Sequence, residues 1–433
     1  MKAPRATHVV LLMLCVMYFI TYLDRVNVST AASGFGQDFH LTKTQIGLVF
    51  SAFAYPYLVF QIIGGWVSDR FGARRTLLVC GLLWALATFL TGMAIGLLSL
   101  LAARLLLGFG EGATFPAASR AMSRWVPRER RGFAQGVTHA FARIGNAAAP
   151  AAVVYIMATH GWRASFYVCG AISFVWVALW SYSFTENPQD HPRITQRELD
   201  SLPAKKDEDI HVPWGLLFRR MVPVTIVYFC YGWTLWLWLS WIPQYFLHNY
   251  SLDLMKSAVS ASVVFLAGVV GDILGGMITD TLYTRTGSLR RARSWMVALC
   301  MMLTLLSLIP LFLTHNFTVS IACLASGFFF AEMTIGPMWA IPLDIAPEYS
   351  GTASGMMNTG SALAAILSPV VSGYLIDRFN DWNLPFVGSM VLMAIGVILA
   401  LRMRPDIRFE AEGAQAQAPA RLSGAPHAGI ERP

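Results

Sequence analysis

Charged residues are scarce in this sequence. Of its 433 residues, only 13% are Asp, Glu, Lys or Arg, whereas 56% are hydrophobic. An average soluble domain carries roughly 25% charged residues, about twice that share. So little charge excludes an ordinary soluble domain and is typical of a protein that lies in a membrane.

Cysteine is also scarce, and its spacing fits no metal site. The sequence further lacks a glycine-rich phosphate loop, a nucleophile–base pair and a metal-ligand cluster. We therefore expect neither an enzyme nor a protein with a metal or another cofactor. Each cysteine lies in an apolar run, where we expect its thiol to act as a small apolar side chain: Cys15, Cys80, Cys169, Cys230, Cys300 and Cys323.

Long apolar runs, by contrast, fill nearly the whole chain. A run of about 18 or more residues can cross a hydrocarbon core about 30 Å thick. The first run follows Lys2 and Arg5, but it is too long for a cleavable signal peptide and lacks a cleavage site of small residues. The pattern predicts an all-α membrane protein with twelve spans, near 9–30, 45–68, 76–96, 98–122, 132–158, 164–185, 219–247, 257–283, 294–314, 317–343, 351–377 and 384–403.

The net charge of +8 is distributed in a way that predicts the orientation of these spans. With a cytoplasmic N-terminus, 25 of the 32 Lys and Arg residues fall in cytoplasmic segments and four on the opposite side. Cytoplasmic loops of membrane proteins carry such an excess. We expect both termini in the cytoplasm, and we ascribe the basic charge to the orientation of the spans in a membrane rather than to nucleic acid.

The spans form two similar groups of six. The hydrophilic segment 186–213 separates them and is expected to be a cytoplasmic linker, in which Thr195 and Glu198 have capping-box spacing. "VPRERRGFAQG" at 126–136 matches "APEYSGTASG" at 346–355, and Pro150 and Pro369 follow at equal distances. Such repeats predict two bundles, at 1–185 and 214–404, with a central site between them. The tail at 405–433 is expected to be disordered.

"GWVSDRFGARR", from Gly65 to Arg75, resembles the cytoplasmic signature of the major facilitator superfamily. A degraded copy, "GGMITDTLYTRTG" at 275–287, stands at the matching place of the second half. Glycines allow helices to cross closely, and an aspartate can pair with basic residues or a helix end. We expect these segments to form a gate, with these residues: Gly65, Asp69, Arg70, Gly72, Arg74 and Asp280.

Three further stretches, "YLDRVNVSTA", "RLLLGFGEGATFPA" and "GWRASF", resemble the anion:cation symporter branch of that superfamily. This branch includes bacterial proton-coupled permeases for galactonate, glucarate and hexuronates. The resemblance covers residues 8–403. It implies two pseudo-symmetric six-helix bundles and uptake of a small organic anion together with protons.

Four charged residues lie inside the spans of the first half, where each costs about 2.5–3.5 kcal/mol on insertion scales. Arg104 and Glu111 are two turns apart on one face of the fourth span. Asp24 and Arg25 are offset by about 100° around the first span. One arrangement has Asp24 facing Arg104 while Arg25 addresses a central cavity.

This charge chemistry suggests a coupling mechanism. A buried carboxylate can gain a proton when its arginine partner is recruited by another anion. By resemblance to sugar-acid symporters, Asp24 and Glu111 would carry protons, while Arg25, Tyr57 and Arg104 would hold the substrate or the switch. The alternative is a static network of ion pairs that only joins helices.

Other polar residues in the spans extend the candidate site. Gln61 lies one turn after Tyr57, and Tyr55 competes with Tyr57 for a role in substrate binding. By the same resemblance, Trp339 in "IGPMWAIP" and Asn358 in "GMMNTG" would contact the substrate.

Arg143, with His139 one turn earlier, departs from the related permeases. An additional cation suits a substrate with a second negative group, or it pairs with a nearby acid. His139 either titrates or is simply hydrogen-bonded. Asp272 is expected nearer the cytoplasmic end, in the gate network around Asp280, with a further proton or ion-pair site as the alternative.

Glu332 is the counterpart of Glu111 in the second half. Each lies five residues before a proline, Pro337 and Pro116 respectively. Glu332 is therefore a candidate partner for Arg143 or a further proton site.

The leading hypothesis is a monomeric proton symporter of the bacterial inner membrane that carries a small organic anion, with sugar acids as the first substrate class. The aromatic seventh span, "YFCYGWTLWLWLSWIPQYF", keeps aromatic or dicarboxylic acids as a second substrate class. A proton/drug antiporter would more naturally show acids without intramembrane arginines. A non-transporting sensor would bind its ligand without flux.

Overall fold

The structure, a computed structural model, describes residues 5–41, 43–203, 212–250, 254–314 and 316–409. These residues form helices and loops and contain no strand. Twelve helical segments among them are long and apolar enough to cross a membrane, which confirms the predicted fold class. They are Ala6–Ala32, Leu48–Phe71, Ala73–Gly92, Leu97–Trp125, Arg128–His160, Trp162–Ser183, Trp214–Leu239, Val259–Thr286, Arg290–Phe312, Phe317–Ile345, Ser350–Ile376 and Leu384–Arg402.

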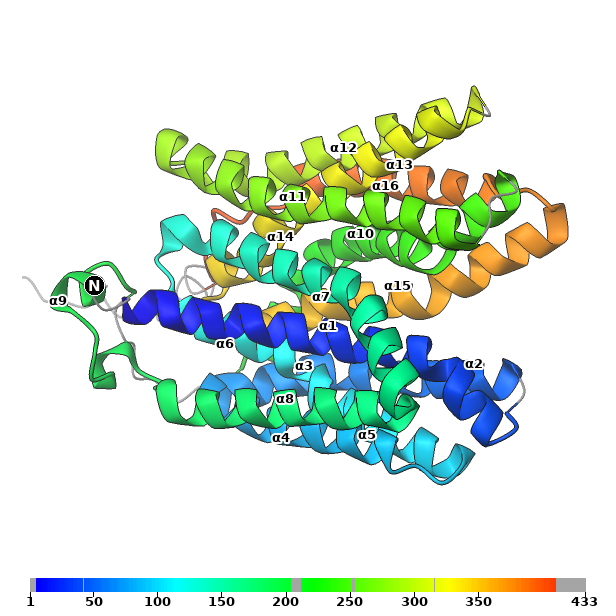
Figure 1. The fold of residues 1–433 in the computed structure, drawn as a ribbon. Coiled ribbons are helices and arrows are strands. Elements are labelled where there is room, and N and C mark those ends of the chain that lie inside the picture. The colour runs from blue at the N-terminus through cyan, green and yellow to red at the C-terminus, as the bar shows by residue number, and fades with distance from the viewer. Residues whose placement is uncertain (1–4, 42, 204–211, 251–253, 315, 410–433) are drawn as a thin grey trace, which may run out of the picture.

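The helices pack in two groups, one above the other in Figure 1. The first half contains α1 (Ala6–Asp38), α2 (Lys43–Ala52), α3 (Ala54–Phe71), α4 (Ala73–Gly92), α5 (Leu97–Gly112), α6 (Thr114–Trp125), α7 (Arg131–His160) and α8 (Trp162–Ser183). The second half contains α10 (Trp214–Asn249), α11 (Leu254–Thr286), α12 (Met296–Leu308), α13 (Phe317–Met333), α14 (Ile335–Ile345), α15 (Ser350–Phe379) and α16 (Leu384–Arg402). Helices suit a membrane because each satisfies its own backbone hydrogen bonds.

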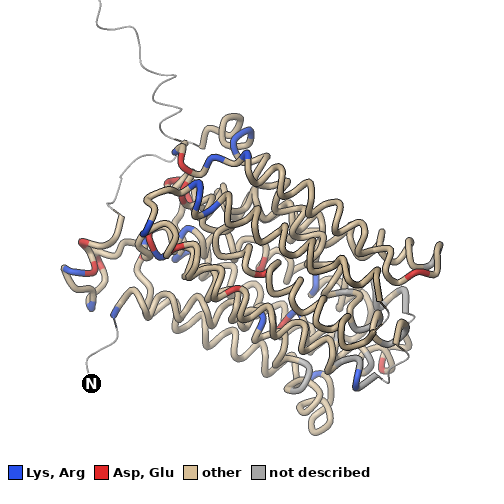
Figure 2. Tube along the Cα trace, turned by 90° about the horizontal axis from the view of Figure 1, so that it is seen from above, with Lys and Arg blue, Asp and Glu red and all other residues tan. Residues whose placement is uncertain are grey.

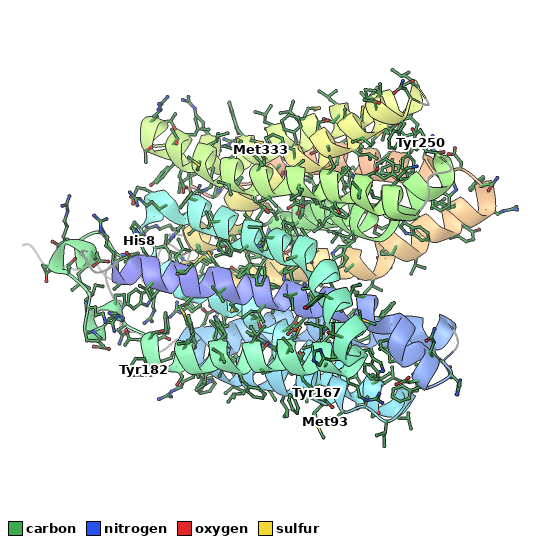
Figure 3. All side chains as sticks on the ribbon, viewed as in Figure 1. His8, Met93, Tyr167, Tyr182, Tyr250 and Met333 are labelled. Carbon is green, nitrogen blue, oxygen red and sulfur yellow. The ribbon has the colours of Figure 1, made fainter. Side chains whose placement is uncertain are left out.

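The outer surface of the helices is apolar. Leu98, Val370 and Tyr182 are 82%, 70% and 87% exposed. Figure 3 shows Tyr182 and Met93 at the outer edge of the first half. Contiguous apolar surface of this kind marks contact with a membrane, so this face of the helices lies against lipid.

Three spans are broken into two helices. The breaks fall at Phe53, between α2 and α3, at Ala113, between α5 and α6, and at Thr334, between α13 and α14. A proline follows each break by three residues, and it cannot donate the backbone hydrogen bond that a continuous helix requires. Glu111 and Glu332 therefore lie in the last turn of α5 and α13.

Both described ends of the chain lie at one face of the molecule, which we call the terminal face. It carries the start of α1, the end of α16 and the short helix α9 (Gln196–Leu199) of the linker. Most of the Lys and Arg residues gather at this end in Figure 2. The halves contact each other through α3, α6 and α7 of the first and α11, α14 and α15 of the second.

The linker helix α9 begins with the expected capping box. The Thr195 Oγ1 accepts a hydrogen bond from the backbone N–H of Glu198, and the Glu198 carboxylate accepts from the backbone N–H of Thr195. Burial alone would raise the pKa of Glu198, but hydrogen bonds from Thr195 and Thr7 outweigh it and lower this pKa. The contact with Thr7 fixes the linker to the start of α1. The predicted disordered tail lies, from residue 410 on, outside the described residues.

Candidate functional site

The first charge centre consists of Asp24, Arg25, Arg104 and Glu111. Its main contact is an ion pair of 2.7 Å between the Arg25 Nε and the Glu111 Oε2. The last turn of a helix disfavours a negative charge, so Glu111, at the end of α5, depends on this arginine. Four aromatic rings surround the Arg25 guanidinium at 4.8–5.3 Å: Tyr22, Phe53, Tyr57 and Phe115.

Asp24 forms no ion pair with Arg104, the residue that one arrangement considered from the sequence placed opposite it. The Asp24 carboxylate instead accepts hydrogen bonds from the hydroxyls of Thr88 and Ser173, at 3.2 and 3.4 Å. Asp24 thus points between α4 and α8, inside the first half, while Arg25 turns toward α5. Asp24 and Arg25 therefore have different partners, as their offset around the helix predicts, but neither partner is Arg104.

Arg104 is 4% exposed and has no ion pair among the described residues. Its guanidinium lies 5.3 Å from the centre of the Phe53 ring, and its Nε donates no hydrogen bond. Asp24 and Glu111 still act on it electrostatically. Two acids and two arginines therefore balance each other in this centre, with one guanidinium available for a further acceptor.

Polar side chains from both halves meet beside the first charge centre. The Asn358 Nδ2 donates to the Gln61 Oε1 at 2.8 Å and to the Tyr57 hydroxyl at 3.4 Å. The Trp339 Nε1 donates to the Tyr228 hydroxyl at 2.7 Å. The structure thus brings together the predicted residues Tyr57, Gln61 and Asn358. Tyr55, the competing residue, is 61% exposed on the outer surface.

The second charge centre consists of Arg143, Asp272 and Glu332 and joins the two halves. The Arg143 Nη2 lies 2.8 Å from the Glu332 Oε2, which also accepts a hydrogen bond of 3.0 Å from the Tyr231 hydroxyl. Sequence reasoning proposed Glu332 as the partner of Arg143 but missed Tyr231. No spacing in the sequence connects that tyrosine with either residue.

Asp272 was expected beside Asp280, and this prediction is wrong. Its carboxylate lies 3.9 Å from the Arg143 Nε, in the second charge centre. The two aspartates are eight residues apart, about 12 Å along a helix, and so belong to different depths. His139, one turn before Arg143, has its Nδ1 2.9 Å from the backbone carbonyl of Gln135.

Asp69 and Asp280 form what we call the terminal latch, in which each half caps a helix of the other. Asp69 accepts hydrogen bonds from the backbone N–H groups of Gly351 and Thr352 at the start of α15, at 3.0 and 2.6 Å. Asp280 accepts from those of Gly132 and Phe133 at the start of α7, at 3.1 and 2.6 Å. Both carboxylates satisfy otherwise unpaired donors and lie at the positive ends of helix dipoles.

Neighbouring residues close the latch further. The Gly65 position leaves no room for a side chain, since a Cβ there would lie 2.4 Å from the Gly351 carbonyl oxygen. Asp344, which sequence reasoning missed, contacts three arginines, from η1 (Arg128–Arg130), α7 and the second half, at 3.1–3.3 Å: Arg128, Arg131 and Arg293. The terminal face is therefore closed by charge pairs between the halves.

Three predicted gate residues do not reach the second half. Arg70 is exposed and stacks on Trp66 of its own half. The backbone N–H of Arg74 donates a hydrogen bond to the Glu186 carboxylate. The same carboxylate lies against Gly72, where a Cβ would come within 2.6 Å of it. Arg70, Gly72 and Arg74 thus contact only the first half and the start of the linker.

Removing one cap of the terminal latch is expected to loosen the terminal face. Asp69→Ala loses the acceptor at the start of α15, which costs about 1 kcal/mol in comparable caps. This free energy changes the ratio of closed to open molecules about fivefold. Because Ser350 is buried at this face and the six native cysteines are buried too, a Ser350→Cys probe reports opening by its rate of maleimide labelling.

The matched control is Asp406→Ala, which removes an exposed acid from the same face. If the Ser350→Cys probe is labelled no faster in the Asp69→Ala protein than in the Asp406→Ala protein, this cap does not hold the terminal face closed.

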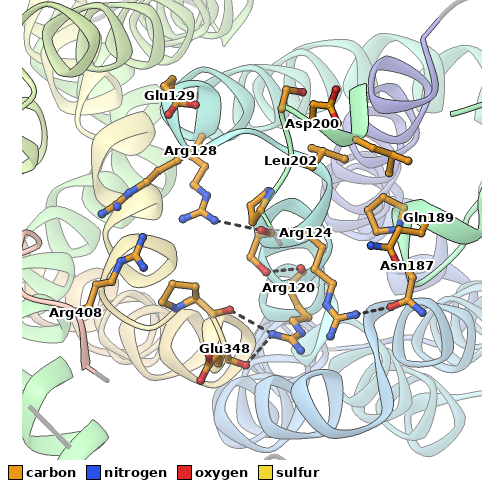
Figure 4. A pocket seen from close by; sticks show the side chains of 17 residues that line it. Arg120, Arg124, Arg128, Glu129, Asn187, Gln189, Asp200, Leu202, Glu348 and Arg408 are labelled. Carbon is orange, nitrogen blue, oxygen red and sulfur yellow. Dashed lines mark hydrogen bonds between the residues drawn. The ribbon is translucent and has the colours of Figure 1, made fainter. Parts of the chain in front are cut away.

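A cavity of about 670 Å³ lies at the terminal face, where the linker meets the latch. Two of its arginines are hydrogen-bonded in Figure 4: Arg120 donates to the carbonyl oxygens of Pro347 and Glu348, and Arg124 to Asn187. None of the predicted substrate-binding residues lines it. The cavity therefore belongs to the latch and not to the charge centres.

Twelve membrane helices in two latched halves, with buried charges at their contact, define a secondary transporter. The chain belongs to the Major Facilitator Superfamily, which it matches over residues 14–369. It is a multi-pass membrane protein of this superfamily and not an enzyme.

Two relatives share nearly the whole chain. It is 45% identical over 406 residues to the probable sulfoacetate transporter SauU of Cupriavidus necator, covering 93% of this chain and 94% of that protein. It is 30% identical over 421 residues to the probable galactarate/D-glucarate transporter GarP of Escherichia coli K12, covering 91% and 94%. The solved structure of the proton:xylose symporter XylE bound to 6-bromo-6-deoxy-D-glucose has the same fold. Its TM-score is 0.74 at 14% identity, over 94% of this chain and 98% of that one.

Proposed function

We propose that this chain takes up a small organic anion into the bacterial cytoplasm together with protons, by alternating access of its two halves. The observation that carries this proposal is the Arg25–Glu111 ion pair at 2.7 Å. It lies beside the Tyr57–Asn358 contact between the halves. An entering anion can compete for Arg25 there, and the arginine side chain, at 12% exposure, is the most accessible part of the pair.

Proton coupling follows from the charge balance of the first centre. With two acids and two arginines, the centre needs no proton while it is empty. An anion that recruits Arg25 or Arg104 adds a negative charge, and a released carboxylate in a buried site then favours protonation. Glu111 is the first proton carrier in this scheme, because it loses its ion-pair partner. Asp24, which accepts hydrogen bonds from two hydroxyls and forms no ion pair among the described residues, is the second.

The terminal face is the cytoplasmic side in this proposal. The positive-inside distribution supports that orientation, and the closed terminal latch then separates the charge centres from the cytoplasm. Substrate binding from outside, followed by release of the latch, gives uptake. Asp69 and Asp280 are the gate residues of this scheme, and the protein works as a monomer in the inner membrane.

The two relatives described above indicate which candidate substrates come first and second. The 45% identity to a probable sulfoacetate transporter favours a small anion with two acidic groups, which a site holding more than one arginine suits. The 30% identity to a probable galactarate/D-glucarate transporter keeps sugar acids as the second class. Lipophilic cations do not suit a site with Arg25, Arg104 and Arg143.

Uptake into proteoliposomes tests the proposal. We expect sulfoacetate or a sugar acid to accumulate when an inward proton gradient is imposed, and uptake to fall at least about tenfold without the gradient. Hexuronates, tartrate and phthalate complete the substrate panel, and Arg25→Ala is the inactive control, because it removes the anion-binding guanidinium. Equal uptake with and without the gradient, or by Arg25→Ala protein, would contradict the proposal.

A further inference from the structure

The second charge centre has two acids for one arginine and is buried throughout. Arg143 comes from α7 of the first half, whereas Asp272 and Glu332 come from α11 and α13 of the second. The three side chains are 2%, 0% and 0% exposed. The first charge centre, by contrast, balances two acids with two arginines.

The helices packed around this centre supply no further cation. α1 contributes Tyr22, whose ring centre lies 5.6 Å from the Arg143 guanidinium carbon, and α10 contributes Tyr228 and Tyr231. Tyrosine hydroxyls are neutral at ordinary pH. His139 of α7 bonds to its own helix and is otherwise faced by the rings of Tyr18, Phe115 and Trp339. Arg143 is therefore the one permanent cation among the described residues that face this centre.

Asp272 and Glu332 have fewer hydrogen-bond donors around them than their carboxylate oxygens can accept. Both oxygens of Asp272 and the Oε1 of Glu332 are buried and accept no hydrogen bond from the described groups. The two carboxyl groups are neighbours, because both lie against the Arg143 guanidinium, Asp272 at 3.9 Å from its Nε and Glu332 at 2.8 Å from its Nη2. Two ionised carboxylates only repel each other, but a proton on one of them lets it donate to the other. Such pairs hold one proton in enzymes that place two carboxylates in one site.

We propose that Asp272 and Glu332 share one bound proton in this closed conformation, and that they bind a second when the halves part. With the shared proton, the centre is neutral. When the halves part, Arg143 leaves with the first half, and the remaining carboxylate loses its only cation. A buried carboxylate without a partner is costly, so protonation accompanies the separation.

This step has a defined pH dependence. The parted form binds one proton more than the closed form, so acid favours opening of the terminal face. One linked proton changes the ratio of the two forms by at most about tenfold per pH unit. The inference rests on the proposed movement of the halves but not on the identity of the substrate.

Infrared spectroscopy of the substrate-free protein tests the shared proton. At about pH 8 exposed acids are ionised, so carbonyl bands of carboxyl groups report buried protonated acids. We expect one such band to disappear in both Asp272→Asn and Glu332→Gln proteins, because the remaining acid then pairs with Arg143 alone. Each amide still donates a hydrogen bond in place of the shared proton, so both variants are expected to fold. Asp406→Asn, an exposed acid of the same half, is the control and should change nothing.

The same band in both variants, or no protonated carboxyl band in the unmodified protein, would overturn the shared proton. Loss of the band in only one variant would assign the proton to that acid alone and would also overturn the sharing.

Distance measurements test the second proton. Spin labels on cysteines at the exposed positions Arg75 and Arg285, one in each half, should report a growing long-distance population as the pH falls from about 8 to 5. Arg143→Gln/Glu332→Gln protein replaces the charges by neutral hydrogen-bonding groups and leaves one protonated acid in both forms. We expect it to lose most of this pH dependence. An unchanged dependence in that variant, or none in the unmodified protein, would overturn the inference. Neither experiment uses a transported substrate, so failed uptake would count against the proposed function alone.

Discussion

Glu111→Gln protein is expected to exchange substrate across the membrane but to lose proton-driven accumulation. Glutamine can still accept a hydrogen bond from Arg25, so binding is retained. It cannot take up or release a proton, and the centre can no longer couple the return of the empty carrier to the gradient. We expect accumulation to fall at least about tenfold, measured as uptake into proteoliposomes under an imposed proton gradient. Counterflow from substrate-loaded liposomes measures the exchange that remains.

Glu129→Gln is the matched control, because Glu129 is an exposed acid at the terminal face and lies outside both charge centres. Accumulation at the unmodified level by Glu111→Gln protein would remove Glu111 from the coupling mechanism. Loss of both accumulation and counterflow would show that the charge of Glu111 is needed for binding rather than for coupling.

A disulfide across the terminal face is expected to stop transport completely. The Ser123 and Ser350 hydroxyl oxygens, one in each half, lie 3.0 Å apart, and both side chains are buried beside the latch. Ser123→Cys/Ser350→Cys protein should therefore form a disulfide in the closed conformation. Because alternating access requires the halves to part at this face, oxidation should abolish uptake, and a reducing agent should restore it.

Each single cysteine variant is the control for this experiment, and oxidation should leave its uptake unchanged. Transport by protein whose cross-linking is complete, as judged by mass spectrometry, would mean that the terminal face does not open during the cycle.

The twelve spans could be predicted because each apolar run is about as long as a bilayer is thick. The positions at which three of these spans break into two helices could not be predicted. Pro116 and Pro337 were visible in the sequence, but membrane helices tolerate proline either with or without a break, depending on how neighbouring groups satisfy the freed backbone. The equal distance of Glu111 and Glu332 from those prolines nevertheless indicated equivalent positions correctly, because each glutamate lies in the last turn of a helix.

The charge pairs show where sequence reasoning stops. It placed four charges of the first half in the interior, because their cost in lipid leaves no other position. It could not choose the partners, since the rotation of each helix depends on side-chain packing. Hydroxyls such as those of Thr88 and Ser173 give no distinctive pattern in an apolar span. Asp272 was placed too near the cytoplasmic end of its span, and therefore with Asp280 rather than with Arg143.

The helix breaks allow the gate to be small. The segments α6 and α14 are 12 and 11 residues long and carry Arg120 and Asp344, respectively. Each is joined to the preceding helix of its own span at a break, Ala113 for α6 and Thr334 for α14. Tilting these two short segments as the halves part would withdraw Arg120 and Asp344 from the contacts that they make across the terminal face.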